Sequence, residues 1–200
     1  MKQLLVGVLL SGVVVLPALA ALKRGDKAPD FSAKASLAGK EFEFSLRSAL
    51  EKGPVVVYFY PSAFTGGCNL EARTFAQNKE KFDAAGASII GVSSDSITRL
   101  NAFSADPEYC AGKIAVASDA DGAIRTAYDL KKMELKPGMK DTRGEEIDHD
   151  FTERTTFVVM PDHKIAATLS SADDKIGPAE HVEKSLAVVQ QLAGGKSSSR

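Results

Sequence analysis

Hydrophobic residues in this chain occur in short runs that alternate with amphipathic segments. The clearest run is VVVYFY at residues 55–60, which is β-branched and aromatic and is apolar on both faces. Such a run is typical of a central strand that is covered on both sides. Similar runs predict buried strands over residues 89–92, near Val116 and over 156–159, and a hairpin arm over 165–169 after the turn PDHK.

Helices are predicted mainly by the residues that suit their ends. Ser45 is suited to cap a helix that ends before Gly53, and Gly86 is suited to end a helix over residues 68–85. Three further helices are predicted over residues 97–105, 122–128 and 179–192. The alternation of strands and helices favours an α/β domain over an all-β sandwich or a helix bundle.

Two segments show neither the hydrophobic period of a helix nor that of a strand. Residues 131–150 are polar and charged and contain Pro137, Gly138 and Gly144, so we expect a long surface loop or insertion. His149 lies among acidic residues there, and we interpret its surroundings as a solvated acidic loop, not a metal site. Residues 194–200 are rich in Gly, Ser and Lys and predict a disordered tail, which leaves residues 21–193 as the domain.

The first twenty residues, MKQLLVGVLLSGVVVLPALA, have the features of a secretory signal peptide. Lys2 provides the positive charge, residues 4–16 the apolar core, and the final ALA the cleavage context. A membrane anchor is the alternative, but the apolar stretch is short and is interrupted by Gly12 and Pro17. We therefore expect cleavage of residues 1–20 and an exported, periplasmic protein without stable membrane association.

Size and composition narrow the possibilities further. Removing 20 of 200 residues leaves 180, which is enough for one domain with a substantial core. The net charge of −1, without a basic patch, argues against nucleic acid as a partner. Cys68 and Cys110 are the only cysteines, and one structural disulfide is a simple interpretation for an exported chain. No CxxC pair and no four-ligand zinc pattern is present.

Cys68 closes the stretch YPSAFTGGC, which directly follows the strand predicted over residues 55–60. This position places the sulfur in the first turn of a helix, where free backbone N–H groups and the helix dipole stabilise a thiolate. Cys68 is therefore a candidate nucleophile. The alternative is an ordinary strand-to-helix turn whose cysteine is merely small and buried.

The stretch also matches PxxxTxxC, with Glu71 three residues after the cysteine. On this motif the sequence resembles the peroxiredoxins (alkyl hydroperoxide reductase/thiol-specific antioxidant family), and among them the subgroup related to bacterioferritin-comigratory protein. Further matches are GDKAPDF at residues 25–31, SDADG at 118–122 and ERTTFVVMPDHKI at 153–165. The resemblance implies a thioredoxin-like fold with a central mixed β-sheet flanked by helices, and a thiol-dependent peroxidase without metal or cofactor.

The resemblance also implies roles for individual residues. Cys68 would attack hydrogen peroxide or a small organic hydroperoxide, Thr65 would orient the peroxide, and Pro61 would shield the pocket. Arg154 would stabilise the thiolate and the charge of the transition state. Each has a simpler alternative, since Thr65 could be only a helix cap and Arg154 a surface residue at a strand end.

The same resemblance assigns supporting roles around the nucleophile. Glu71 would hold the arginine in place, although it could also be a carboxylate favoured by the helix dipole. The backbone N–H groups of Gly67 and Cys68 would complete the set of donors.

Cys110 is the internal candidate for resolving a Cys68 sulfenic acid, as the resemblance implies, through a disulfide between the two residues. Arg73 occupies the family's other resolving position, five residues after the nucleophile. A thioredoxin-like protein or a small thiol would then regenerate the enzyme, which we expect to be a monomer or weak dimer. The alternatives are a peroxide sensor that relays oxidation to a partner, and a non-catalytic domain stapled by a permanent disulfide.

Overall fold

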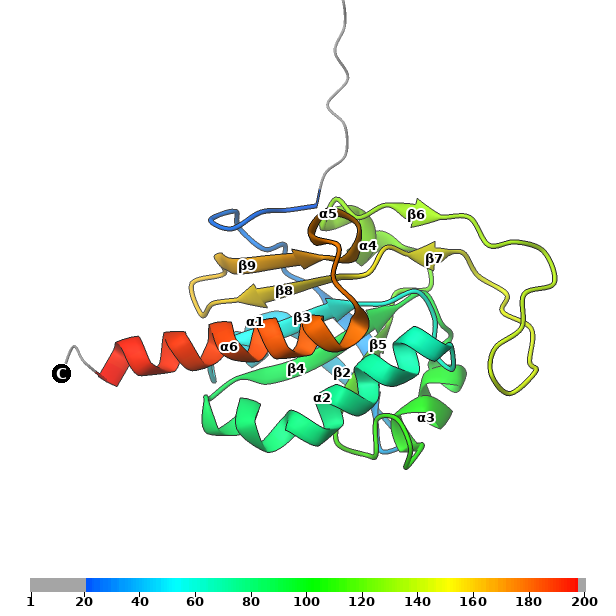
Figure 1. Ribbon diagram of the computed structural model, residues 1–200, viewed down its shortest axis with the longest axis horizontal. Helices are drawn as coiled ribbons and strands as arrows, with labels where there is room; N and C mark the ends of the chain where they lie inside the picture. The colour runs from blue at the N-terminus through cyan, green and yellow to red at the C-terminus, as the bar shows by residue number, and fades with distance from the viewer. Residues whose placement is uncertain (1–20, 198–200) are drawn as a thin grey trace, which may run out of the picture.

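The structure of the protein is a computed structural model that describes residues 21–197, so the predicted signal peptide lies outside the described residues. A seven-stranded mixed sheet forms its centre (Figure 1). Strands β3, β4 and β5 are parallel, and every other neighbouring pair is antiparallel. In spatial order the strands are β2 (Lys40–Ser45), β1 (Ser32–Leu37), β5 (Ala115–Ser118), β4 (Ser88–Ser93), β3 (Val55–Phe59), β8 (Thr155–Val159) and β9 (Ile165–Ser170).

Helices cover both faces of this sheet. One core cluster joins the sheet to α2, α3 and α6, and a second cluster joins the opposite face to α1 and the end of α4. Two short strands, β6 and β7, pair with each other outside the main sheet. These elements are α1 (Leu46–Leu50), α2 (Gly66–Ala84), α3 (Ile97–Ala105), α4 (Ala123–Ala127), α5 (Ser171–Asp174), α6 (Pro178–Ser197), β6 (Lys132–Met133) and β7 (Phe151–Thr152).

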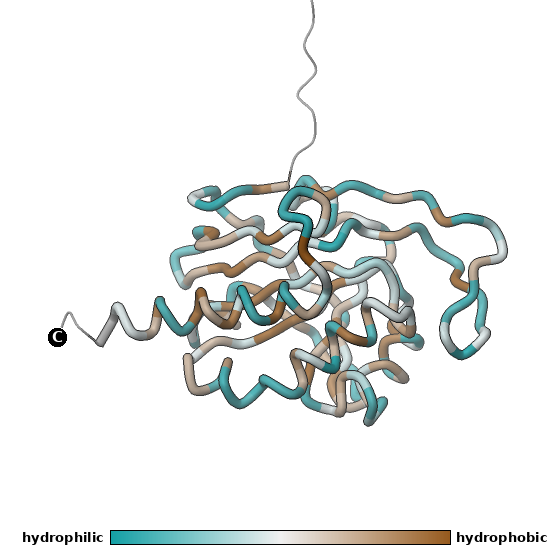
Figure 2. The backbone as a smooth tube through the Cα atoms, viewed as in Figure 1, coloured by the Kyte–Doolittle hydropathy of each residue, from teal (hydrophilic) through white to brown (hydrophobic). Residues whose placement is uncertain are grey.

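Strand β3 is the core of the domain because both of its faces are buried. Val56 and Tyr58 pack into the cluster under α2, whereas Val55 and Val57 pack into the cluster on the other face. The hydropathy of the chain follows this arrangement, with hydrophobic segments gathered in the central strands (Figure 2). The predicted central strand is thus confirmed, and its carboxyl end leads into the loop that precedes Cys68.

The predicted elements agree with the structure to within a few residues, and the short elements α5, β6 and β7 were not predicted. Helix α3 has the predicted bounds, while α2 begins two residues earlier than predicted. The β1–β2 hairpin was not predicted, because β2 is largely exposed and its segment has few apolar residues. Helix α6 extends to Ser197, so residues 194–197 are helical where we expected a disordered tail. Propagating an existing helix by a few residues is far easier than starting one, which accounts for this difference.

Residues 131–150 form the predicted long loop, with β6 at its start and irregular structure after it. Figure 1 shows the loop extending past β6 and β7 toward the end of the sheet where α2 begins. The loop is not fully exposed to solvent, because Asp141 and Ile147 within it are buried. Between residues 21 and 197, no helix has the length and apolar character needed to cross a membrane.

We predict that Gly91→Ala destabilises the protein by about 1–3 kcal/mol, because a methyl group at this position overpacks the core. A Cβ on Gly91 would lie 2.5 Å from Cζ of Tyr58 on the neighbouring strand. Urea unfolding followed by circular dichroism measures the change. Gly194→Ala is the control, since its Cβ meets no atom within 4 Å. Equal stability of Gly91→Ala and the unmodified protein would contradict this reading of the core.

Candidate active site

Cys68 is the third residue of α2, and its side chain is only 2% exposed. The first helical N–H group with an acceptor is that of Asn69, which donates to the carbonyl of Thr65 at 2.8 Å. The N–H groups of Gly67 and Cys68 have no acceptor within the described part of the chain. The predicted location in the first helical turn is confirmed, and two free backbone donors lie in the same turn as the sulfur.

Arg154 reaches this sulfur from the segment between β7 and β8. Its Nη2 donates to the Cys68 sulfur at 3.2 Å, and its Nη1 donates to the carboxylate of Glu71. The arginine side chain is 10% exposed and that of Glu71 is fully buried. Arg154 is therefore not a surface residue, and one guanidinium serves two acidic groups. Burial raises the pKa of Glu71 to about 7, although the attraction of Arg154 opposes this change.

Gly67 is small because two groups approach it closely. A Cβ at this position would lie 3.3 Å from Nη2 of Arg154 and 3.4 Å from Cγ of Pro178, the first residue of α6. A larger side chain would press on the arginine that contacts the sulfur. Pro61, predicted to shield the pocket, follows β3 and is partly buried. The start of α2, the approach to β8 and the start of α6 thus meet at one point.

Thr65 is the N-terminal cap residue of α2, but its side chain does not cap the helix. Its hydroxyl donates instead to the carbonyl of Ser62 at 2.8 Å. Because the hydroxyl proton is used in this bond, the oxygen keeps its lone pairs for another donor. The preceding residue, Phe64, has a left-handed backbone with φ of 60°, which is uncommon for a bulky residue.

Cys110 is a free and fully buried thiol, as Cys68 is free, so no disulfide joins them in this structure. Burial raises the pKa of the Cys110 thiol, with a further contribution from Asp106. Both cysteines belong to the core cluster that contains Tyr58. A buried neutral thiol is a poor nucleophile. The structure, in which both thiols are buried, therefore does not favour attack by Cys110 on the sulfur of Cys68.

The turn that carries Cys110 is held to α2 by Arg73. The Nε of Arg73 donates to the carbonyl of Glu108 at 2.7 Å, and its guanidinium lies 5.8 Å from the ring centroid of Tyr109. Ala111, on the other side of the cysteine, has a φ of 53°. Arg73 therefore supplies a polar tether between this turn and the helix that carries Cys68.

The interpretation of His149 as part of a solvated loop was wrong. Its side chain is 13% exposed, and its Nε2 lies 2.8 Å from Oδ1 of the buried Asp95. Asp95 in turn contacts Ser62 and Ala63, next to Thr65. Neither residue was a predicted site residue. A sequence signal that could have identified Asp95 is its place shortly after a buried parallel strand, where such sheets commonly position functional groups.

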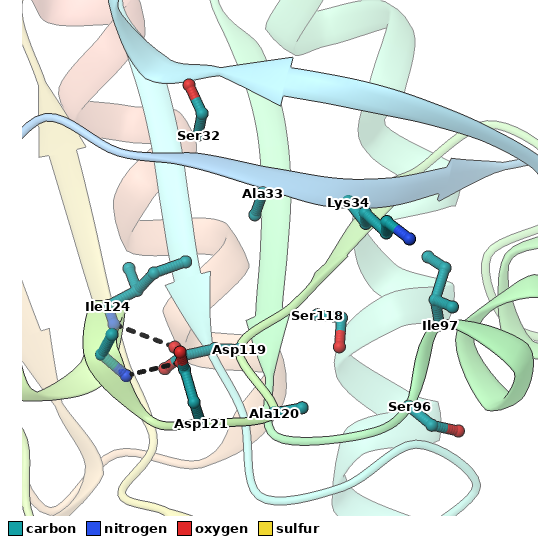
Figure 3. A pocket seen from close by; sticks show the side chains of 11 residues that line it. Ser32, Ala33, Lys34, Ser96, Ile97, Ser118, Asp119, Ala120, Asp121 and Ile124 are labelled. Atoms are coloured by element: carbon teal, nitrogen blue, oxygen red, sulfur yellow. Dashed lines mark hydrogen bonds between the residues drawn. The ribbon is translucent and has the colours of Figure 1, made fainter.

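The hollow shown in Figure 3 lies away from Cys68, between β1, the start of α3 and the segment before α4. Its buried carboxylate, Asp119, accepts from the backbone N–H groups of Ile124 and Arg125 at 2.9 and 2.8 Å. These bonds give Asp119 a structural role at the start of α4. The residues lining the hollow include no cysteine, so we place the reactive centre at Cys68.

A cysteine in the first turn of a helix, contacted by an arginine that precedes a strand of the central sheet, is typical of thiol-based redox proteins. Comparison with known proteins agrees with this class. The model of the AhpC/TSA family matches residues 24–168. Peroxiredoxin Bcp of Xanthomonas campestris is 32% identical over 139 residues, covering 70% of this chain and 78% of that protein. Peroxiredoxin Bcp of Escherichia coli is 30% identical over 144 residues, covering 72% and 83%.

Solved structures show the same relationship. Peroxidoxin BcpB of Mycobacterium tuberculosis aligns with a TM-score of 0.69 at 29% identity, over 85% of this chain and 97% of that chain. The bacterioferritin comigratory protein of Xanthomonas campestris, a structure described for alkyl peroxide reduction activity, aligns with a TM-score of 0.61 at 30% identity, over 80% and 91%. The chain belongs to the AhpC/TSA family and has the thioredoxin-like peroxiredoxin fold. Its distant homology to these proteins indicates a thiol peroxidase.

We predict that Glu71→Gln changes how stability depends on pH. The pKa of Glu71 rises from 4.5 to about 7 on folding, so the folded protein binds more protons than the unfolded chain between these values. Wild-type stability should therefore fall relative to Glu71→Gln as pH rises through this window, by on the order of 1–3 kcal/mol. Urea midpoints from pH 4 to pH 8 measure the difference. If stability depended on pH in the same way in both proteins, Arg154 would offset the effect of burial and the pKa of the Glu71 carboxyl would not be raised.

Proposed function

We propose that this protein is a thiol-dependent peroxidase in which Cys68 reduces hydrogen peroxide and small organic hydroperoxides. The observation that carries this proposal is the hydrogen bond from Arg154 to the buried sulfur at the start of α2. This contact favours negative charge on sulfur, which peroxide attack requires. The alkyl peroxide reduction activity described for the Xanthomonas campestris relative supports organic hydroperoxides as substrates.

The first step is attack of the Cys68 thiolate on one peroxide oxygen. A sulfur–oxygen bond forms while the oxygen–oxygen bond breaks, so sulfur is oxidised to sulfenic acid and the peroxide is reduced to water or alcohol. Negative charge develops on the departing oxygen, which takes up a proton as it leaves. Arg154, which contacts the sulfur, and the free N–H groups of Gly67 and Cys68 would stabilise this charge.

Thr65 and Pro61 complete the proposed pocket. Since the Thr65 hydroxyl donates to the Ser62 carbonyl, its oxygen can accept a hydrogen bond from the peroxide O–H. That bond would orient the peroxide for displacement along the oxygen–oxygen axis. Pro61 lacks a backbone N–H group and adds an apolar surface beside the loop.

Cys110 is the proposed resolving residue. Its thiolate would attack the sulfur of the Cys68 sulfenic acid, so that the sulfur–sulfur bond forms as the sulfur–oxygen bond breaks, and the hydroxide that leaves takes up a proton from solvent to become water. Because Cys110 is buried and its pKa is raised, this step requires the turn around it and the first turn of α2 to open. A thioredoxin-like protein or a small dithiol would then reduce the disulfide, and residues 1–20 would direct the protein to the periplasm.

We predict that reduced wild-type protein consumes hydrogen peroxide orders of magnitude faster than a free thiol near neutral pH. Cys68→Ser should abolish this reaction, whereas Cys110→Ser should keep the first turnover and lose the disulfide. Stopped-flow mixing with one equivalent of peroxide, followed by mass spectrometry of the product, measures both results. A wild-type rate no higher than that of an ordinary thiol would rule out the peroxidase.

We also predict that Arg73→Met speeds formation of the Cys68–Cys110 disulfide by about two- to fivefold, because an exposed polar tether contributes up to about 1 kcal/mol. Formation of the sulfenic acid should not change, since Arg73 does not contact Cys68. Quenched-flow trapping of free thiols after peroxide addition separates the two steps. Arg47→Met, at an exposed ion pair on another helix, is the control. An unchanged rate of disulfide formation would show that the tether does not limit opening.

A further inference from the structure

Asp95 is a buried carboxylate that the thiol chemistry does not itself require. Its Oδ2 accepts from the N–H group of Ala63 at 2.8 Å and from the hydroxyl of Ser93 at 2.7 Å. Its Oδ1 accepts from the hydroxyl of Ser62 at 2.9 Å and contacts Nε2 of His149 at 2.8 Å. Two of these four donors belong to the loop that precedes Thr65.

His149 is charged in this arrangement. Its Nδ1 lies 2.9 Å from the carbonyl oxygen of Asp150, and its Nε2 faces the Asp95 carboxylate. Both partners are acceptors, so both ring nitrogens must carry a proton. Burial acts against this charge, but the hydrogen bond to Asp95 raises the pKa of His149 overall. The carboxylate and the imidazolium therefore form a buried ion pair.

Arg99 on α3 joins the same cluster. Its Nε lies 2.9 Å from Oδ1 of Asp95, and its Nη2 donates to Asp141 at 2.7 Å and to the carbonyl of Ala63 at 3.1 Å. Arg143 also binds Asp141, so the two carboxylates face three cations around the cysteine loop, Arg99, Arg143 and His149. Such mutual compensation is what allows charges to remain buried. Asp141, Arg143 and His149 all come from residues 131–150, so this loop supplies most of the charged groups in the cluster.

The cluster and the loop together hold three consecutive residues next to the active site. Ser62 and Ala63 bind Asp95 and Arg99, while the carbonyl of Phe64 accepts from the N–H group and the hydroxyl of Thr142 at 2.9 and 2.8 Å. The left-handed backbone of Phe64 is unfavourable by itself and persists only where its surroundings fix it. Ser62 is also the residue whose carbonyl orients the Thr65 hydroxyl.

We propose that Asp95, held by His149 and Arg99, is the positioning residue that fixes Thr65 relative to the Cys68 sulfur. Residues 131–150 are thereby part of the functional unit and not a neutral insertion. The catalytic consequence rests on the proposed peroxidase function. Misplacing a reacting group by about 1 Å can cost about a hundredfold in rate, so loss of the cluster should slow peroxide reduction while the sulfur keeps its own reactivity.

The test compares His149→Ala and His149→Gln with His163→Asn, all in the Cys110→Ser background. We expect His149→Ala to lower the rate of the first peroxide turnover at least about tenfold, with alkylation of Cys68 by iodoacetamide unchanged. His149→Gln keeps one donor toward Asp95 and should recover part of the rate. His163 lies in the β8–β9 turn, so its variant should match the unmodified protein. General unfolding would instead raise the alkylation rate.

A second measurement does not depend on peroxidase activity. Hydrogen exchange at the Ala63 amide, which donates to Asp95, should be slow in the unmodified protein and in His163→Asn. It should become at least about tenfold faster in His149→Ala if the cluster holds the loop. Unchanged exchange and unchanged peroxide rate in His149→Ala would overturn the proposal. If no protein in the series reduced peroxide, the exchange result would still decide whether Asp95 positions the loop.

Discussion

The candidate site depends on one cation that serves two buried acidic groups. Arg154 donates to the Cys68 sulfur and to Glu71, and both partners lie almost entirely out of water. These contacts join the start of α2 to the approach of β8. Nearby His181 is also affected, since burial and then Arg154 lower its pKa to about 4 and keep it neutral. The guanidinium thus opposes the effect of burial on the pKa of Glu71 and adds to the effect of burial on the pKa of His181.

A second layer of polar contacts fixes the loop that leads to this centre. Asp95 binds the loop from the end of β4, and residues 131–150 bind it from outside. Aromatic packing adds to these bonds, because the ring of Phe64 contacts Phe103 and lies under the guanidinium of Arg143. We propose that the first layer stabilises negative charge on the sulfur and that the second sets the geometry around it.

Local sequence signals were sufficient for the central strand, the cysteine at the start of α2 and the order of most elements. They were sufficient because each depends on neighbouring residues, as in the uniformly apolar run that became β3. They could not reveal the pair between Asp95 and His149, which are 54 residues apart and meet only after folding. Among acidic neighbours, a histidine that binds a buried carboxylate has the same sequence pattern as one in solvent.

In the proposed mechanism, the sharing of Arg154 between Cys68 and Glu71 would also link oxidation of the sulfur to the contacts that hold the first turn of α2. A thiolate pulls the guanidinium toward the first turn of α2, whereas a neutral sulfenic acid would attract it much less. After oxidation, Arg154 would belong mainly to Glu71, one turn further along the same helix. In the proposed cycle, oxidation of Cys68 would thus weaken the contact that holds the first turn of α2, and this turn must open before the disulfide can form. Arg154 alone would then set the order of the two steps.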